Sequence, residues 1–196
     1  MHWRALFALV LVLAGSALVA TTAAGESGNR DPVVDLVVRD CSKDDDLDVD
    51  YPLWVLRRAL DELPRQVRRH TRCERVIERA IDRAKRRLDR EVFRIWVDCG
   101  RDDELDRDYS VRALRRALRL LPDDLRMYSD CEDVIERALE RAHRRLRREV
   151  ERIIRDCERH RRLDGDYSLE ALFRALRRVG DDKHCVRAIV RAIEHH

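Results

Sequence analysis

One unit is repeated three times along this chain, and this repeat limits the possible folds more than any other feature. The first cysteines of the copies stand at intervals of 58 residues, at Cys41, Cys99 and Cys157. The same register aligns a Leu-Asp-x-Asp-Tyr segment that ends at Tyr51, Tyr109 and Tyr167. The third copy is shorter by four residues, so the second cysteines are Cys73, Cys131 and Cys185. Self-similarity at a fixed period predicts a repeat architecture.

Apolar residues in each copy recur at the spacing of three and four residues that places them on one face of a helix. In the middle copy they form three groups: Val92, Ile95, Trp96 and Cys99; Val111, Leu114, Leu118 and Leu121; and Val134, Ile135, Ala138 and Leu139. We therefore predict an all-α fold of three tandem modules of about 58 residues, each with three helices.

Long shared helices are expected to join the modules. No helix-breaking residue lies between Cys73 and Cys99 or between Cys131 and Cys157, so the third helix of one copy should continue as the first helix of the next. The middle of the second stretch has few apolar residues and is expected to be a solvated strut. The expected shape is small separate cores on a semi-rigid helical string. The alternative is that the copies fold back on each other.

The first residues have the pattern of a secretory signal peptide. Arg4 gives a basic start, residues 5–20 are uncharged and mostly apolar, and small residues follow at Ala23 and Ala24. An uncleaved anchor helix is the alternative, although the run is short for crossing a bilayer. The predicted organisation is a signal peptide at 1–24, a flexible start at 25–30, and helical modules at 31–84, 85–142 and 143–196. The mature chain is expected to be secreted or held in the cell envelope, without a transmembrane segment.

Six cysteines in an exported chain predict three disulfides. Six cysteines allow fifteen pairings, and the sequence alone does not choose among them. The repeat favours closure of each copy on itself, through the pairs Cys41–Cys73, Cys99–Cys131 and Cys157–Cys185. Metal binding and redox chemistry are the alternatives, but the chain contains no Cys-x-x-Cys motif.

Charged residues are abundant but nearly balanced, with a formal net charge of +3. This small excess does not predict nucleic-acid binding through the field of the whole molecule. Only three of the 42 basic residues are lysines, so arginine dominates. Because acidic residues are interleaved with the arginines, we interpret most of them as solvated helix faces. The expected partner is an unidentified extracellular or envelope protein.

The acidic loops suggest a calcium site, because clustered carboxylates supply some of the oxygens that calcium needs. The candidate ligands are Asp48, Asp50, Asp106, Asp108, Asp164 and Asp166. No loop has the twelve-residue calcium-binding pattern, and turn and helix-start chemistry explains the shared aspartates better. The repeated tyrosines are expected to pack on the cores. Trp54 and Trp96 have no aromatic counterpart in the other copies, which predicts local roles for them.

No catalytic residue and no cofactor are predicted. Ser110 and Ser168 stand where helix N-caps are expected. Thr71 with Glu74 and Ser129 with Glu132 have capping-box spacing. The sequence contains no phosphate-binding loop, zinc-protease motif or nucleophile elbow.

The middle copy carries the segment Tyr128-Ser-Asp-Cys131-Glu-Asp-Val-Ile135. It resembles uncharacterised actinobacterial exported helical modules that carry a Tyr-Ser-Asp-Cys signature. The first copy departs from the signature, with His70-Thr-Arg-Cys73, and the third copy lacks the segment. The resemblance implies an extracellular or envelope setting and no particular activity.

These observations predict a non-enzymatic secreted or envelope protein that acts in structure or in interaction. Tandem modules on helical spacers suit multivalent binding, since linked contacts raise the effective concentration of each other. A calcium-dependent structural protein and a secreted enzyme inhibitor are the alternatives.

Overall fold

The computed structural model describes residues 31–160, 162–163, 165–180 and 182–196. The predicted signal peptide and flexible start lie outside the described residues. Within them the fold is all-α, as predicted, and has the helices α1 (Pro32–Asp44), α2 (Leu53–Asp61), α3 (Arg65–His70), α4 (Cys73–Asp102), α5 (Val111–Arg119), α6 (Asp123–Tyr128), α7 (Cys131–His160), α8 (Leu169–Arg178) and α9 (Lys183–Glu194).

The predicted shared helices are α4 and α7, each of 30 residues and therefore about 45 Å long. The expected module boundaries at 84/85 and 142/143 fall inside them. The short helices α3 and α6 were not expected. Each begins directly after a proline, Pro64 or Pro122, whose φ of −58° or −57° suits the start of a helix.

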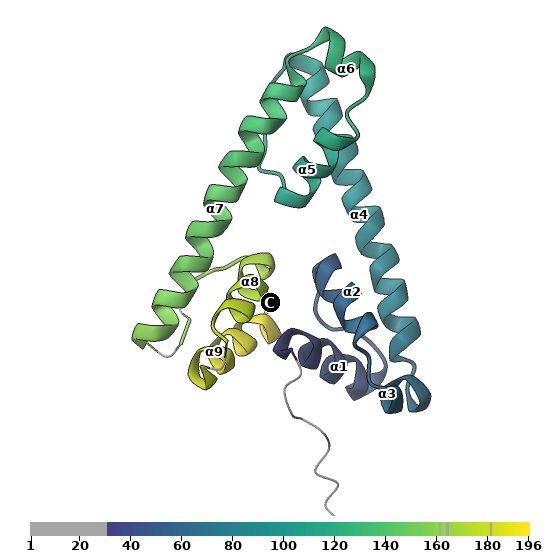
Figure 1. Cartoon of the computed structure of the whole chain (residues 1–196), viewed down its shortest axis with the longest axis vertical. Coiled ribbons are helices and arrows are strands. Elements are labelled where there is room, and N and C mark those ends of the chain that lie inside the picture. Colours follow the sequence, from purple (N-terminus) through teal and green to yellow (C-terminus); the bar gives the residue numbers. More distant parts are fainter. Residues whose placement is uncertain (1–30, 161, 164, 181) are drawn as a thin grey trace, which may run out of the picture.

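The expected string of separate cores is wrong, and the chain instead closes into a triangle (Figure 1). The helices α4 and α7 diverge from the end where α6 lies, and α1 and α9 lie at the wide end of this V. Contacts of α1 with both α4 and α8, and of α9 with both α7 and α8, complete the ring. The main apolar cluster contains buried residues from all three copies. The middle of α7 belongs to it through Ala142 and Val150, so this stretch is not a fully solvated strut.

Aromatic residues join the first copy to the third and so close the ring. The ring of Phe173 on α8 is fully buried, with its centroid 5.6 Å from that of Tyr51 and 6.4 Å from that of Trp54. Trp54 Nε1 donates to Glu170 at 3.2 Å, and the Arg177 guanidinium lies over the Trp54 ring at 5.2 Å. The local role expected for Trp54 is therefore wrong, because its contacts reach residues more than a hundred positions away in the sequence.

Disulfides hold the corners of the triangle. The bonded pairs are Cys41–Cys73, Cys99–Cys131 and Cys157–Cys185, with Cα atoms 5.6, 5.7 and 5.3 Å apart.

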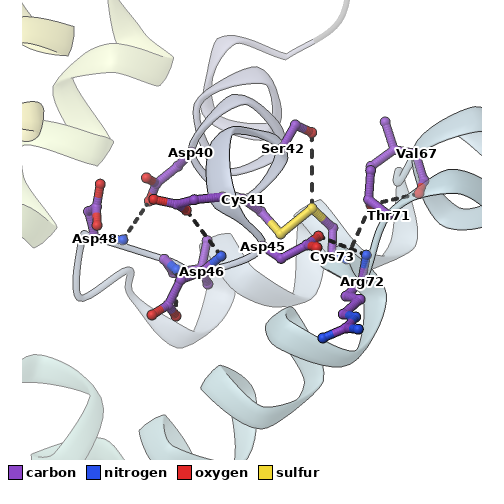
Figure 2. The surroundings of a disulfide bond; sticks show 12 residues. Asp40, Cys41, Ser42, Asp45, Asp46, Asp48, Val67, Thr71, Arg72 and Cys73 are labelled. Atoms are coloured by element: carbon purple, nitrogen blue, oxygen red, sulfur yellow. Dashed lines mark hydrogen bonds between the residues drawn. A yellow bond between two sulfur atoms is a disulfide. The ribbon is translucent and has the colours of Figure 1, made fainter.

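In the first corner, Asp45 ends α1 in the left-handed conformation, at φ 61° (Figure 2). Its carboxylate accepts from the backbone N–H of Arg72 at 2.9 Å. Asp103 makes the same bond to Asp130 at 3.0 Å, so backbone and covalent links reinforce each other at two corners.

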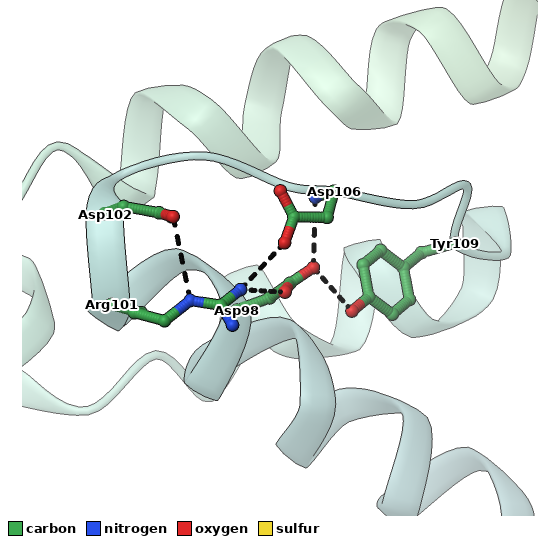
Figure 3. Close-up of polar contacts among 5 residues, drawn as sticks. All are labelled: Asp98, Arg101, Asp102, Asp106 and Tyr109. Atoms are coloured by element: carbon green, nitrogen blue, oxygen red, sulfur yellow. Dashed lines mark hydrogen bonds and ion pairs between the residues drawn. The ribbon is translucent and has the colours of Figure 1, made fainter.

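An aspartate stands directly before the first cysteine of each copy and bonds to the acidic loop or its tyrosine, and in the middle copy this residue, Asp98, is buried. In the middle copy, the Asp98 carboxylate accepts from the Tyr109 hydroxyl at 2.9 Å and from the backbone N–H of Asp106 at 3.1 Å (Figure 3). The Arg101 guanidinium donates to the same Asp98 carboxylate at 2.9 Å. Asp156 accepts from the Tyr167 hydroxyl in the same way. The three repeated tyrosines are buried, as predicted, and burial followed by the bond to Asp98 raises the pKa of Tyr109 to about 12.

Replacing Asp98 with alanine is expected to lower the free energy of unfolding by about 2–3 kcal/mol, because the Tyr109 hydroxyl and the Asp106 N–H lose their acceptor. Urea unfolding followed by circular dichroism measures the loss. Asp102→Ala is the matched control, since Asp102 is exposed and forms an ion pair with Arg101 at 3.6 Å, and it should change the stability by less than about 0.5 kcal/mol. Equal effects of the two substitutions would contradict the structural role of Asp98.

Candidate functional site

A cavity of about 610 Å³ lies where the three copies meet, and we call it the central cavity. The first copy contributes the start of α2, the middle copy contributes α5, the third copy contributes the start of α8, and α4 passes along the cavity. Trp54, Arg112 and Glu170 occupy the same position in the three copies, and all of them line it. Closure of the ring therefore creates a space that no single copy could form.

The wall contributed by α5 is made of arginines. Arg112, Arg115, Arg116 and Arg119 line the cavity, and we call them the arginine stripe. Their spacing of i, i+3, i+4 and i+7 places them along one side of the helix. The opposite side of α5 carries Ala113, Leu114 and Ala117, which are buried. Burial of this apolar side against the core turns the arginine stripe toward the cavity. The four Cα positions extend over about 10 Å, at a rise of 1.5 Å per residue.

Acidic residues neutralise only part of the charge at the central cavity. Arg87 pairs with Asp50 at 3.0 Å, and Arg174 pairs with Glu170 at 2.8 Å. Glu91, the third acid of the lining, is used to hold the start of α5, where it accepts from the backbone N–H of Ser110 at 2.7 Å. Six arginines and three acids line the cavity, so it carries an excess of positive charge.

Two members of the arginine stripe have no ion pair with any described residue, namely Arg112 and Arg119. Desolvation, followed by the charge of Arg57, lowers the pKa of the Arg112 guanidinium. Arg116 pairs with Asp89 at 2.8 Å, but its Nε is buried without a hydrogen-bond partner among the described residues. Positive groups are thus held close together with unused donors, which is the condition under which an anion binds favourably.

The fourth member of the stripe contacts a histidine. Arg115 donates to Nε2 of His143 on α7 at 3.0 Å. Burial, followed by the charges of Arg115 and Arg174, lowers the pKa of His143, which keeps the ring neutral and able to accept this bond. His143 also lines a second cavity of about 380 Å³, the side cavity, together with Arg144, Arg147, Arg174 and Arg178. Arg174 lines both cavities, so the two are neighbours.

Of the predicted calcium ligands that the structure describes, Asp50 lines the central cavity and the others lie elsewhere, and most of them are paired with basic residues. Asp48 forms an ion pair with Lys43 at 3.3 Å, and Asp50 forms one with Arg87. Asp106 forms an ion pair with Arg101 at 2.8 Å. Asp108 meets Arg145 at 2.9 Å. Asp166 lines a separate cavity beside the C-terminus, and Asp164 lies outside the described residues. In the described part of the chain, metal-ligand groupings occur only at two disulfide corners, where the bonded sulfurs offer no thiolate.

The hydroxyl residues at the predicted helix starts have structural roles. Ser110 and Ser168 are N-caps, as predicted, and accept from the backbone N–H groups of Ala113 and Ala171. The capping box expected at Thr71 has a different form. Its hydroxyl donates to the Val67 carbonyl at 2.7 Å and accepts from the Cys73 N–H at 3.2 Å, while Glu74 pairs with Arg68. The extra helix α3 supplies that carbonyl and that arginine, and so explains the difference.

Sequence reasoning missed the central cavity because it treated the arginines as solvated faces with interleaved acids. That description holds for most of the chain. It does not hold for residues 110–121, which contain four arginines and no acidic residue. This local absence of acids was the signal that could have marked α5 as a helix with unpaired positive charge.

Comparison with known proteins does not assign this site. The chain matches no protein-family model, no curated protein and no solved structure.

Within the described residues, no helix combines the length and the apolar character that crossing a bilayer requires.

Proposed function

We propose that this chain is a non-enzymatic secreted or cell-envelope binding protein that takes an anionic ligand in its central cavity. The observation that carries the proposal is the arginine stripe, in which Arg112 and Arg119 face the cavity without an ion pair to any described residue. Guanidinium groups bind phosphate and carboxylate through paired, charge-assisted hydrogen bonds. A cavity of about 610 Å³ is in the size range of small-molecule sites.

The closed ring supports binding because it holds the arginines in place before a ligand arrives. Like charges repel, so arginines on a flexible segment would move apart. Here the buried side of α5 and the disulfide Cys99–Cys131, which closes the loop that contains α5, restrain the helix. A preorganised site loses less conformational freedom on binding, which leaves more of the interaction energy for affinity.

The disulfides support the proposed setting. Three bonded pairs are consistent with an extracellular protein, since disulfides persist in oxidising compartments. The predicted signal peptide and the resemblance to exported modules point in the same direction, and both remain predictions.

Inorganic phosphate is the first probe, measured by isothermal titration calorimetry on the oxidised chain at low ionic strength. We expect one binding event that weakens as salt is added, because screening reduces the attraction between exposed charges. The double variant Arg112→Gln/Arg119→Gln should weaken binding at least about tenfold, since it removes both guanidiniums of the stripe that have no ion pair to a described residue.

The matched control is Arg86→Gln/Arg90→Gln on α4. These two arginines are exposed, line none of the described cavities and carry the same charge change. The control should retain the wild-type affinity. Equal losses in the two double variants would refute the proposed site.

A further inference from the structure

We infer that the ligand of the central cavity is a short linear polyanion, a chain of phosphate groups that lies along α5, rather than a single anionic group. This inference rests on the proposed anion-binding function and specifies the class of ligand. It starts from the shape of the arginine stripe, which is a line of charges and not a compact cluster.

The length of the arginine stripe favours an extended ligand. Arg112 and Arg119 are separated by seven residues, and therefore by about 10 Å along α5. A single phosphate group is much smaller than this separation, so it contacts both guanidiniums only if the two side chains bend toward each other, against the repulsion between their like charges. An anion with three or more acidic groups in a row reaches both ends. Only such a ligand neutralises the whole stripe.

Further positive charge surrounds the arginine stripe and favours a ligand with several negative groups. At one end, Arg112 is near Arg57 of the first copy, and this charge contributes to the lowered pKa of Arg112. In the middle, Arg115 contacts His143, whose ring is also near Arg174. The side cavity continues the basic lining with Arg144, Arg147 and Arg178. A ligand that extends beyond α5 therefore meets more guanidiniums in this direction.

The remaining lining limits how the ligand lies. Asp50 and Glu91 line the central cavity where α4 passes it, and they repel an anion from that wall. Glu170 does the same at the start of α8, although its pairing with Arg174 and with Trp54 Nε1 reduces its charge effect. Because the acidic residues repel an anion from the other walls, α5 is the wall of the central cavity where an anion binds most favourably. The cavity volume suits a short chain of linked groups rather than a folded macromolecule.

The experiment compares orthophosphate, pyrophosphate and tripolyphosphate in metal-free buffer, by calorimetry on the oxidised full-length mature chain. We expect the affinity to rise along this series, with tripolyphosphate bound at least about tenfold more tightly than orthophosphate. The affinity for tripolyphosphate should also fall more steeply with salt, since more charges are brought together.

Single variants at the two ends of the stripe test the linear arrangement. Arg112→Gln and Arg119→Gln should each weaken tripolyphosphate binding about fivefold or more. The affinity for orthophosphate should fall in at most one of these two variants. Arg90→Gln is the control and should change neither affinity. Far-ultraviolet circular dichroism and the unfolding midpoint identify variants that fail to fold, and the comparison then uses Arg112→Lys and Arg119→Lys, which keep the charge and lose the paired donors.

The outcomes separate the two proposals. Two results would refute the inference of a linear ligand and leave anion binding intact. One is equal affinity for orthophosphate and tripolyphosphate. The other is a loss of tripolyphosphate affinity in only one of the two end variants. If none of the three anions binds, both the inference and the proposed function are wrong.

Discussion

Replacing Phe173 with alanine is expected to lower the free energy of unfolding by about 3–5 kcal/mol. Phe173 is fully buried, and its ring contacts Tyr51 and Trp54 of the first copy. The substitution removes a large apolar side chain and leaves a cavity at the place where the ring of helices closes. It should therefore destabilise the junction between the first and third copies as well as the third copy.

Urea unfolding followed by circular dichroism gives the stability, and tryptophan fluorescence reports on the junction through Trp54. We expect the Phe173→Ala variant to shift the fluorescence of the folded protein, because the ring that packs edge-on against Trp54 is lost. Phe93→Ala is the control, since Phe93 is 63% exposed on α4. A loss below about 1 kcal/mol with unchanged fluorescence would show that the copies do not meet at Phe173.

Removing the disulfide Cys99–Cys131 by a double substitution to serine is expected to cost about 3–4 kcal/mol. The two cysteines are 32 positions apart, and opening this loop releases chain entropy in the unfolded state. The bond joins the end of α4 to the start of α7, so its loss also loosens the narrow end of the V, where these two helices meet.

Chemical unfolding of the oxidised protein measures this loss, and mass spectrometry of non-reduced peptides verifies that the other two pairs are intact. The matched comparison is the double serine variant of Cys157 and Cys185, which opens a loop of similar length at another corner. A loss below about 1 kcal/mol for the first variant would contradict a stabilising role for the disulfide. If phosphate binding weakens more in the first variant than in the second, closure of the loop that contains α5 contributes to binding.

The function proposed here depends on the same closure that these two predictions probe. The arginine stripe belongs to the middle copy, but the cavity in front of it is completed by Trp54 of the first copy and Glu170 of the third. A chain with three separate cores would leave the stripe without the walls that the other two copies contribute. Closure partly desolvates Arg112, while Arg115 and Arg119 stay exposed, and charge-assisted bonds to a ligand are stronger where water is excluded.

Much of the local structure could be read from the sequence. The three- and four-residue spacing of apolar side chains predicted the helices, and the absence of a breaker between Cys73 and Cys99 predicted the long helix α4. Ser110 and Ser168 were identified as N-caps. These features were accessible because they depend on contacts within a few residues along the chain. The register of the copies also suggested which cysteines lie close together.

The ring and its cavity were decided only in the tertiary structure. The short helices α3 and α6 were missed because their six residues carry too little periodic pattern to stand out. Trp54 was assigned a local role because its partners, Glu170 and Phe173, lie in a different copy. Arginines that look alike in the sequence became different in the fold, since only those on α5 face the central cavity without neighbouring acids on their own helix. Helix formation depends on interactions between near neighbours, whereas ring closure depends on packing between distant segments, which no local pattern encodes.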